Sequence, residues 1–500
     1  MVGSACWSGA LLTTAAGVES HVLPLVYLGY GALGGVGWGL LYLTPVTSAM
    51  KWFPDRRGLA TGIALSAFGA GAAIAPSLIH YLIDYFSVAP TFVGDCLLTG
   101  GDASRPLVQL ATLADGSQVV ASASPVGEPG TPVVVATDAD ISRHSGQNMG
   151  AGVYQVGSGD TGVSKALASL GVLYGAIGAI GSRFMMIPHP EWSPGQESPD
   201  SKAGADRKES IAIGLPASYV TTNTRQFPLL WMSVFGNATG GLALLSSSKL
   251  MLTDIFAGLA PDIVTPSFAT GYVSALGIGM ALGRFSWSAA SDILGRQNTY
   301  ALFGLGIPIV GMAPFLCHTV ADLTGGAAGG GDANVLPYLL TFYSCSVLAI
   351  TFYGGIFSVL PAYIADLFGQ QHAGAIHGKA LTAWAGSAVC GPMGLAYLRS
   401  YSYDAALTDL LRTVETHDAA SFEKSFGVPS ADDEAVRKLI DAKTITIEKL
   451  MELAPQGTVD PTPFLYDSTC YVAAGLMSLA ALSNLAIRPL DLKAELKKVK

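Results

Sequence analysis

Long apolar runs constrain this chain more than any other feature of its sequence. A hydrocarbon core about 30 Å thick is crossed by roughly 20 helical residues. Ten runs can be counted on this basis, the first of them short, and only 13% of the residues are charged, against about 25% in an average soluble protein. We therefore predict an all-α integral membrane protein. The runs are 3–19, 22–53, 59–87, 165–188, 226–250, 269–291, 299–318, 336–366, 377–400 and 465–487.

The distribution of lysine and arginine predicts the orientation of these spans. An even number of spans puts both termini on one side, and by the positive-inside rule the side richest in cations is cytoplasmic. The termini, a Pro- and Ser-rich linker at 190–225 and a basic tail at 490–500 are thus predicted to be cytoplasmic, in a plasma or organelle membrane. The cations on this side are Lys51, Arg56, Arg57, Lys202, Arg207, Lys208, Arg225, Arg296, Lys493, Lys497, Lys498 and Lys500.

Two long polar insertions fall on the opposite side. Residues 88–162 are acidic and rich in Gly, Ser, Val and Thr, which favours an extended or weakly β domain, or disorder. Residues 402–463 include "DDEAVRKLIDAKTITIEKLMEL", with apolar residues at helical spacing and acid–base pairs four residues apart. This pattern predicts an amphipathic helix.

An internal repeat relates two loops of the chain. "TPVTSAMKWFPDRRGLATGIALSAFGAGAAIAP" (44–76) aligns without a gap to "LPAYIADLFGQQHAGAIHGKALTAWAGSAVCGP" (360–392), and Gly58 and Gly62 match Gly374 and Gly378. Six spans separate the copies, which is the arrangement of a twelve-helix transporter made of two parallel halves.

Counting from this period assigns the spans to two halves. The first half is predicted at 1–189 and holds the equivalents of helices three to six. The second half is predicted at 226–489 and holds helices seven to twelve. The chain therefore corresponds to ten helices of an expected twelve, and we expect either a fragment or a protein without the first two.

The repeat and one loop motif identify a resemblance. "GRFSWSAASDILGR" (283–296) resembles the GxxxDxxGR loop of the major facilitator superfamily. "YLGYGALGGVGWGLLYLTPVTSAMKWFPDRRGLATG" and "FYGGIFSVLPAYIADLFGQQHAGAIHGKALTAWAGSAVCGP" look like the oxalate:formate antiporter branch and its relatives, the monocarboxylate transporters. The resemblance covers nearly all spans and neither insertion. It implies a carrier of small carboxylates whose halves rock around a central site, as an antiporter or together with a proton.

Arg284 is the strongest candidate for contact with substrate. It precedes Asp292 by eight residues, about 12 Å along a helix, so it lies well inside the membrane if Asp292 marks the cytoplasmic mouth. An arginine there normally faces a cavity or a partner, and its planar fork fits a carboxylate. The alternatives are snorkelling to the interface or pairing with a structural acid. In the carboxylate carriers of this resemblance, an arginine of this helix contacts substrate.

Three aromatic residues are predicted to line the cavity: Tyr42, Tyr353 and Trp384. Trp384, in "LTAWAG", takes the position at which the oxalate carrier has a second cation, a lysine. One intramembrane cation suits a monoanion such as formate, lactate or pyruvate better than a dianion. Packing or interface positions are the ordinary alternative for such aromatic side chains.

Charged residues near the cytoplasmic ends of the spans are predicted to form a gate. Asp292 is expected to cap the positive N-terminus of a neighbouring helix, the one that begins near Gly378. Asp366 is expected to pair with Arg296, and Arg56 and Arg57 are expected to serve gating of the first half or topology. Such contacts hold a mouth shut in one state and break in the other. A role in topology alone is the alternative.

The glycines of "GYGALG" (29–34) satisfy GxGxxG, but they lie in an apolar run rather than at a strand–helix turn, which argues against a dinucleotide site. We predict instead that glycines from Gly29 to Gly39 allow close helix packing.

No basic stripe favours nucleic acid as a partner, and the six scattered cysteines have no CxxC spacing. We found no catalytic triad, Walker loop or zinc motif above chance, so we expect no enzyme activity, no cofactor and no metal. The expected partners are a small carboxylate, the lipid bilayer and, for a symporter, protons. The competing hypothesis is a non-transporting scaffold or receptor that presents the two insertions. Transport of another small solute on the same fold also stays open.

Overall fold

The computed structural model describes most of the chain, in ranges separated by gaps. They are residues 1–94, 157–189, 213–257, 262–324, 335–429, 433–442, 444–455 and 457–499, residue 260, and short strands between 96 and 155. Each of the ten predicted apolar runs is built mainly of helix. Within these ranges six stretches are long and apolar enough to cross a membrane. They are Leu23–Trp52, Val163–Phe184, Gln226–Phe256, Arg296–Val320, Leu336–Phe368 and Thr462–Leu485.

The chain divides into two compact units. The first comprises 1–42 and 74–186, and the second comprises 43–73 and 187–500. Helices α3 (Gly34–Trp52) and α4 (Arg57–Phe86) each contribute residues to both units.

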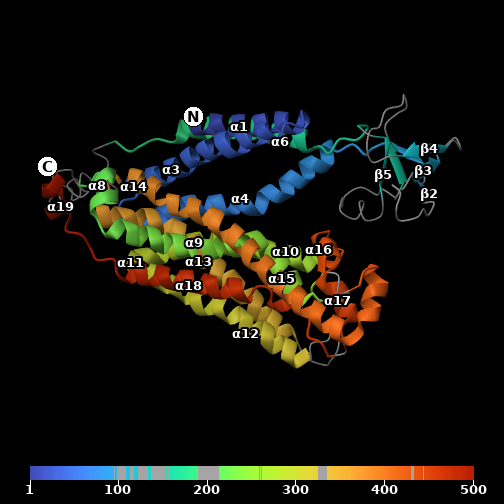
Figure 1. The fold of residues 1–500 in the computed structure, drawn as a ribbon. Helices are drawn as coiled ribbons and strands as arrows, with labels where there is room; N and C mark the ends of the chain where they lie inside the picture. The colour runs from blue at the N-terminus through green and yellow to red at the C-terminus, as the bar shows by residue number, and fades with distance from the viewer. Residues whose placement is uncertain are drawn as a thin grey trace. The chain divides into compact units, whose positions relative to one another are not determined.

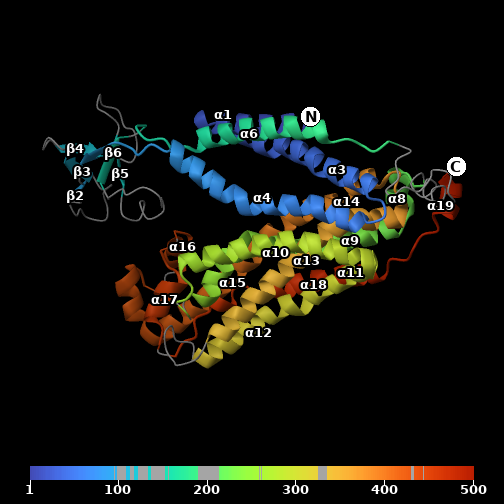
Figure 2. The same ribbon diagram turned by 180° about the vertical axis from the view of Figure 1, so that it is seen from behind.

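In the first unit, α1 (Val2–Glu19) packs along α6 (Val163–Phe184), as both ribbon views show (Figures 1 and 2). The Ser8 hydroxyl donates a 2.8 Å hydrogen bond to the carbonyl of Gly171 in this contact. After α1 come the short helix α2 (Leu23–Val26), a π-helical stretch η1 (Tyr27–Leu33) and α3.

The glycines between 29 and 39 pack as predicted at three of their positions. A Cβ atom at Gly29 would lie 2.7 Å from the Thr14 hydroxyl oxygen. One at Gly37 would lie 2.7 Å from the Trp7 backbone nitrogen, and one at Gly34 would be in ordinary contact with α1. No Cβ contact within 4 Å is found at Gly31, Gly35 or Gly39 among the described residues. The π-helical stretch and the start of α3 therefore approach α1 through glycine surfaces.

The first insertion contains strands, as the extended alternative predicted. Two small antiparallel sheets form, in the orders β1-β6-β5 and β2-β3-β4. The strands are β1 (Phe92–Gly94), β2 (Cys96–Leu97), β3 (Gln109–Thr112), β4 (Gln118–Ala121), β5 (Val133–Ala136) and β6 (Gly152–Gln155).

The second unit is a helical bundle with one continuous apolar core. Its long helices are α9 (Gln226–Phe256), α10 (Pro266–Leu294), α12 (Gly306–Thr324), α13 (Leu336–Phe368), α15 (Thr382–Phe426) and α18 (Asp467–Leu485). Shorter helices connect or flank them: α8 (Ala217–Asn223), α11 (Arg296–Leu302), η2 (Phe303–Leu305), α14 (Ala373–Ala380), α16 (Asp433–Asp441), α17 (Ile447–Leu453), η3 (Thr462–Phe464) and α19 (Leu492–Val499).

Two boundary predictions in this unit were wrong. The span predicted at 377–400 is part of two helices, α14 and then α15, which continues without interruption to Phe426. The sequence predicted an end where apolar residues become sparse, but Leu407, Leu410 and Val414 carry a buried helix face onward. Helical spacing of apolar residues, rather than mean hydropathy, sets this length.

The single amphipathic helix expected in the second insertion is two helices, α16 and α17. The break lies where "TIT" (444–446) brings three β-branched residues together, which lowers helix propensity. Thr446 then starts α17, because its hydroxyl accepts a hydrogen bond from the Lys449 backbone N–H at 3.4 Å.

A polar network next to the second insertion links α15, the end of α9 and the start of α18. The Arg399 guanidinium of α15 donates to Asp254 at the end of α9, at 2.7 Å, and the Tyr466 hydroxyl donates to the same carboxylate oxygen, also at 2.7 Å. All three side chains are largely withdrawn from solvent. The carboxylate is therefore paired with both a cation and a hydroxyl donor.

Candidate functional site

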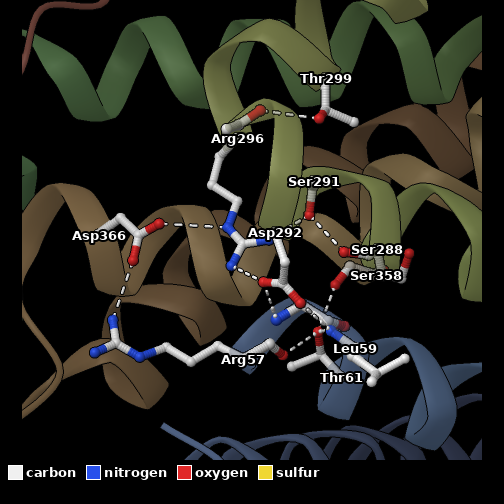
Figure 3. Close-up of polar contacts among 12 residues, drawn as sticks. Arg57, Leu59, Thr61, Ser288, Ser291, Asp292, Arg296, Thr299, Ser358 and Asp366 are labelled. Carbon is white, nitrogen blue, oxygen red and sulfur yellow. Dashed lines mark hydrogen bonds and ion pairs between the residues drawn. The ribbon is translucent and has the colours of Figure 1, made fainter. Parts of the chain in front are cut away.

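The candidate gate is built around Asp292, on the last turn of α10 (Figure 3). Its two carboxylate oxygens accept hydrogen bonds from the backbone N–H groups of Gly58 and Leu59, at 3.0 Å and 2.8 Å. These are among the first N–H groups of α4, which have no partner inside their own helix. Asp292 therefore caps α4 with a negative charge placed at the positive end of the helix dipole.

The helix that Asp292 caps differs from the one predicted. The sequence favoured the helix that begins near Gly378, whereas the carboxylate binds the start of α4 at Gly58. Each copy of the repeat has a glycine at the start of a helix, Gly58 in α4 and Gly374 in α14, so the sequence does not distinguish the two helix starts. Only the packing of α10 against the first turns of α4 selects one.

Two arginines and a second carboxylate extend this site. Arg296 contacts Asp292 and also donates to Asp366 at the end of α13, where the distance is 3.3 Å. The same Asp366 accepts a 3.0 Å hydrogen bond from Arg57 at the start of α4. The sequence predicted the contact between Arg296 and Asp366, and the structure adds the pairing of Arg57 with Asp366. Arg56, one residue earlier, is exposed.

Glycine at position 58 is required by this arrangement. A Cβ atom there would lie 2.8 Å from a carboxylate oxygen of Asp292 and would overlap the Ser288 carbonyl and Arg296. One turn on, a Cβ at Gly62 would lie 2.7 Å from the Ser288 Cβ. The glycines thus allow the backbone of α4 to reach α10, which places two N–H groups within hydrogen-bonding distance of Asp292.

Their repeat partners are packed less tightly. A Cβ at Gly374 would lie 3.0 Å from the Thr47 side chain, and one at Gly378 would lie 3.7 Å from Leu43. The two loops share their glycines, but within the described ranges a carboxylate binds backbone N–H groups only at the first copy.

Arg284 lies two turns before Asp292 on α10, and only 3% of its surface is exposed. One terminal nitrogen donates to the Leu65 carbonyl of α4 at 3.1 Å, and the guanidinium carbon lies 4.6 Å from the centre of the Phe68 ring. The arginine is therefore held inside the bundle by a carbonyl and an aromatic face, and it does not reach outward to an interface. Neither Leu65 nor Phe68 was predicted, because neither is polar.

The aromatic candidates divide between the two units. Tyr353 is buried on α13 and stacks edge-on against Phe357, with ring centres 5.1 Å apart, and Phe357 lies 5.2 Å from Trp384. Arg284 lies against α13 beside Tyr353, since a Cβ atom at the neighbouring Gly354 would lie 3.3 Å from the Arg284 side chain. These residues form one group in the second unit, whereas Tyr42 is buried in the first unit.

Within the described ranges, no three His, Cys, Asp or Glu side chains are grouped so that they could hold a metal ion. The Arg284 guanidinium is suited to binding an anion. The charged groups around Asp292 are suited to pairing with one another.

Comparison with known proteins identifies several relatives of this chain. No family model matches it. The apicoplast pyruvate carrier 1 of Toxoplasma gondii is 23% identical over 81% of this chain. The oxalate:formate antiporter of Oxalobacter formigenes is 21% identical over 77% of it. The chain is similar to carboxylate carriers.

A shorter match supports the same likeness: monocarboxylate transporter 12 of Xenopus laevis is 35% identical over 99 residues, 19% of the chain. The resemblance to carboxylate carriers and monocarboxylate transporters identified from the loop motif and the repeat is confirmed. The predicted class of a helical membrane protein agrees with the six helices that are long and apolar enough to cross a membrane. The first two relatives are matched over 65% of their own length, so the chain spans just under two thirds of each.

Proposed function

We propose that this protein is a secondary transporter that moves small carboxylates across a membrane by alternating access, and that it is not an enzyme. The observation that carries the proposal is Arg284, a buried cation on α10, the helix of the predicted span 269–291, in a chain whose relatives include carriers named for pyruvate, oxalate and formate. A charge at this depth is costly, and a function that requires an anion to bind there accounts for it.

In this proposal Arg284 binds the substrate carboxylate. Its Leu65 and Phe68 contacts hold the guanidinium in place, so little side-chain entropy is lost when an anion arrives. Tyr353 and Trp384 stand beside it as the wall of the site. Because Trp384 supplies no charge, the preferred substrate is a monocarboxylate of the formate, lactate or pyruvate type.

The cluster around Asp292 is the gate of this transporter. The caps on Gly58 and Leu59 and the paired charges of Arg57, Arg296 and Asp366 hold α4 against α10 and α13 in the state that the structure describes. We place this end at the cytoplasmic side, together with both termini. Opening requires these bonds to break. Binding of a second anion for exchange, or co-transport of a proton, then allows the carrier to return to its starting state.

Uptake into proteoliposomes tests the function. Purified protein is reconstituted, and uptake of radiolabelled formate, lactate, pyruvate and oxalate is measured with each anion, or a pH gradient, on the other side. We expect saturable uptake of at least one monocarboxylate. Complete absence of carboxylate uptake or exchange with well-folded protein contradicts the proposal and leaves the scaffold hypothesis.

Variants of Arg284 test the site itself. Loss of one charge-assisted contact of about 1.5–3 kcal/mol predicts that Arg284→Gln lowers uptake by about one to two orders of magnitude. Arg284→Lys keeps the charge without the planar fork, so it should recover only part of the rate. The matched control is Arg183→Gln, an exposed arginine at the end of α6. Normal transport by Arg284→Gln would refute the assignment of the substrate site.

A further inference from the structure

A narrow apolar cavity lies inside the helical bundle of the second unit, on a different side of α13 from Arg284. It is lined by α9, α12, α13, α15 and α18, and its volume is about 80 Å³. Protein interiors hold few voids larger than a water molecule. Small residues at Gly240, Ala313, Ala349 and Ala473 line this space, where larger side chains would fill it.

The cavity is elongated along the helix axes. Its lining runs on α18 from Thr469 to Met477, eight residues or about 12 Å, and on α13 from Phe342 to Ile356. A space of this volume and length is narrow. It fits a single extended alkyl chain better than a compact ring.

Each end of the cavity carries a buried polar atom that has no hydrogen-bond partner among the described residues. The Asn237 side-chain oxygen and the Thr469 hydroxyl are in this condition, and the two residues are only 4% and 7% exposed. One turn after Asn237 on α9, a Cβ atom at Gly240 would contact Met477 and Ala473 of α18. Asn237 therefore lies level with Met477, and Thr469 lies about two turns away along α18. A buried polar atom without a partner costs free energy that a ligand can recover.

None of the side chains described around this cavity carries a charge. An ionised head group would lose its hydration without compensation, so a fatty carboxylate or a phospholipid head group is disfavoured. The Asn237 oxygen can only accept a hydrogen bond, whereas the Thr469 hydroxyl can both donate and accept and can rotate. A ligand therefore needs a hydrogen-bond donor at the Asn237 end of the cavity more than at the Thr469 end.

We propose that this cavity is a binding site for an uncharged linear alkyl chain that ends in a hydroxyl group, with the hydroxyl donating to Asn237. The alkyl chain extends between α9, α12, α13 and α18 towards Thr469. The site is separate from the proposed carboxylate site, but Tyr353 belongs to the wall of both. Its occupancy is measured directly, so the proposal stands or falls independently of transport.

The test is photolabelling of the full chain in lipid nanodiscs with a diazirine derivative of 1-octanol, with the adducts located by mass spectrometry. We expect adducts on residues that line the cavity, reduced by excess 1-octanol but not by octanoate. Adducts confined to residues outside the cavity, or equal competition by octanoate, overturn the proposal.

Substitutions locate the ligand within the cavity. Ala473→Leu fills it and should abolish the internal adducts. Ala474→Leu makes the same change one residue later, outside the lining, and should leave the adducts unchanged. Asn237→Leu removes the acceptor while keeping the branched shape and the number of side-chain heavy atoms, and it should weaken labelling about tenfold, as expected for one buried hydrogen bond.

A second isosteric change separates the two ends of the cavity. Thr469→Val should change labelling less than Asn237→Leu does. Equal labelling of Ala473→Leu and Ala474→Leu, or a larger effect of Thr469→Val, contradicts the proposal. Each variant is compared at matched thermal stability and elution volume, and competition on the unmodified chain gives a result that needs no variant.

Discussion

Replacing Asp292 with asparagine tests whether the gate depends on a charged cap. The carboxylate accepts from two backbone N–H groups and contacts Arg296. Asparagine keeps one acceptor oxygen and no charge, so one hydrogen bond is lost and the other becomes neutral. Hydrogen bonds to charged groups contribute about 1.5–3 kcal/mol and neutral ones about 0.5–1.5 kcal/mol. A charge at a helix N-terminus adds about 0.3–1 kcal/mol.

The stabilisation of the closed gate should fall by about 2–3 kcal/mol in this variant. This is the lower end of the sum, because the Asp292 side chain is 18% exposed and its charge is partly screened. At 1.4 kcal/mol per factor of ten, the ratio of closed to open gate should fall about 30- to 150-fold. This shift is expected only if the contacts break on opening, because an interaction present in both states shifts no population.

Spin labels measure the shift. One label is placed at Asp55, before α4, and one at the exposed Asn298 of α11, in a variant whose six native cysteines are replaced. Pulsed electron–electron resonance then gives the distribution of distances across the gate. We expect a longer-distance population to grow in Asp292→Asn and to stay unchanged in Asp262→Asn, the same change at an exposed site. An unaltered distribution would refute the gating argument.

Three further predictions concern the second unit. Gly58→Ala should destabilise the protein by about 1–3 kcal/mol, because the added Cβ overlaps the Asp292 cap. Gly71→Ala on the same helix, where a Cβ has no contact within 4 Å, should be neutral or stabilising. Thermal unfolding compares the two variants, and equal effects on stability would contradict the prediction. Asp254→Ala removes the carboxylate that Arg399 and Tyr466 share and should cost about 1–3 kcal/mol, which chemical unfolding measures. Lys498 holds the pKa of Glu495 below its usual range, so Glu495→Gln should speed hydrogen exchange in α19 at pH 7, and this difference should vanish as the pH falls through the lowered pKa.

The sign of the last prediction follows from the ion pair. A carboxyl whose pKa is lower in the folded state stabilises that state above its ordinary pKa. It loses this effect as protonation removes the charge. If the difference in hydrogen-exchange rate between Glu495→Gln and the unmodified chain grew towards low pH, it would contradict a stabilising ion pair between Glu495 and Lys498.

Much of the site follows from the sequence because its parts are marked by chemistry. An arginine in an apolar run, and acids and arginines at the ends of such runs, stand out against a background with few charges. Arg284, Asp292, Arg296 and Asp366 were found in this way, and the structure places the last three in one cluster. Their roles in binding and gating remain predictions.

The partners of these residues did not follow from the sequence. Asp292 binds backbone N–H groups of α4, and Arg284 binds a backbone carbonyl and a phenylalanine ring. Backbone groups exist at every residue, so no letter in the sequence marks the ones that will be used. The extension of α15 to Phe426 was missed for a related reason, since its burial depends on contacts with α17 that lie far along the chain.

The sequence alone determined that this chain spans a membrane and is helical, because about 20 consecutive apolar residues have few other stable arrangements in a bilayer. It also determined that glycines recur at the starts of two helices. Only the tertiary structure decided which of those helix starts receives a carboxylate. The deciding factor is the approach of α4 to α10 at Gly58, where the absence of a side chain lets two N–H groups reach Asp292.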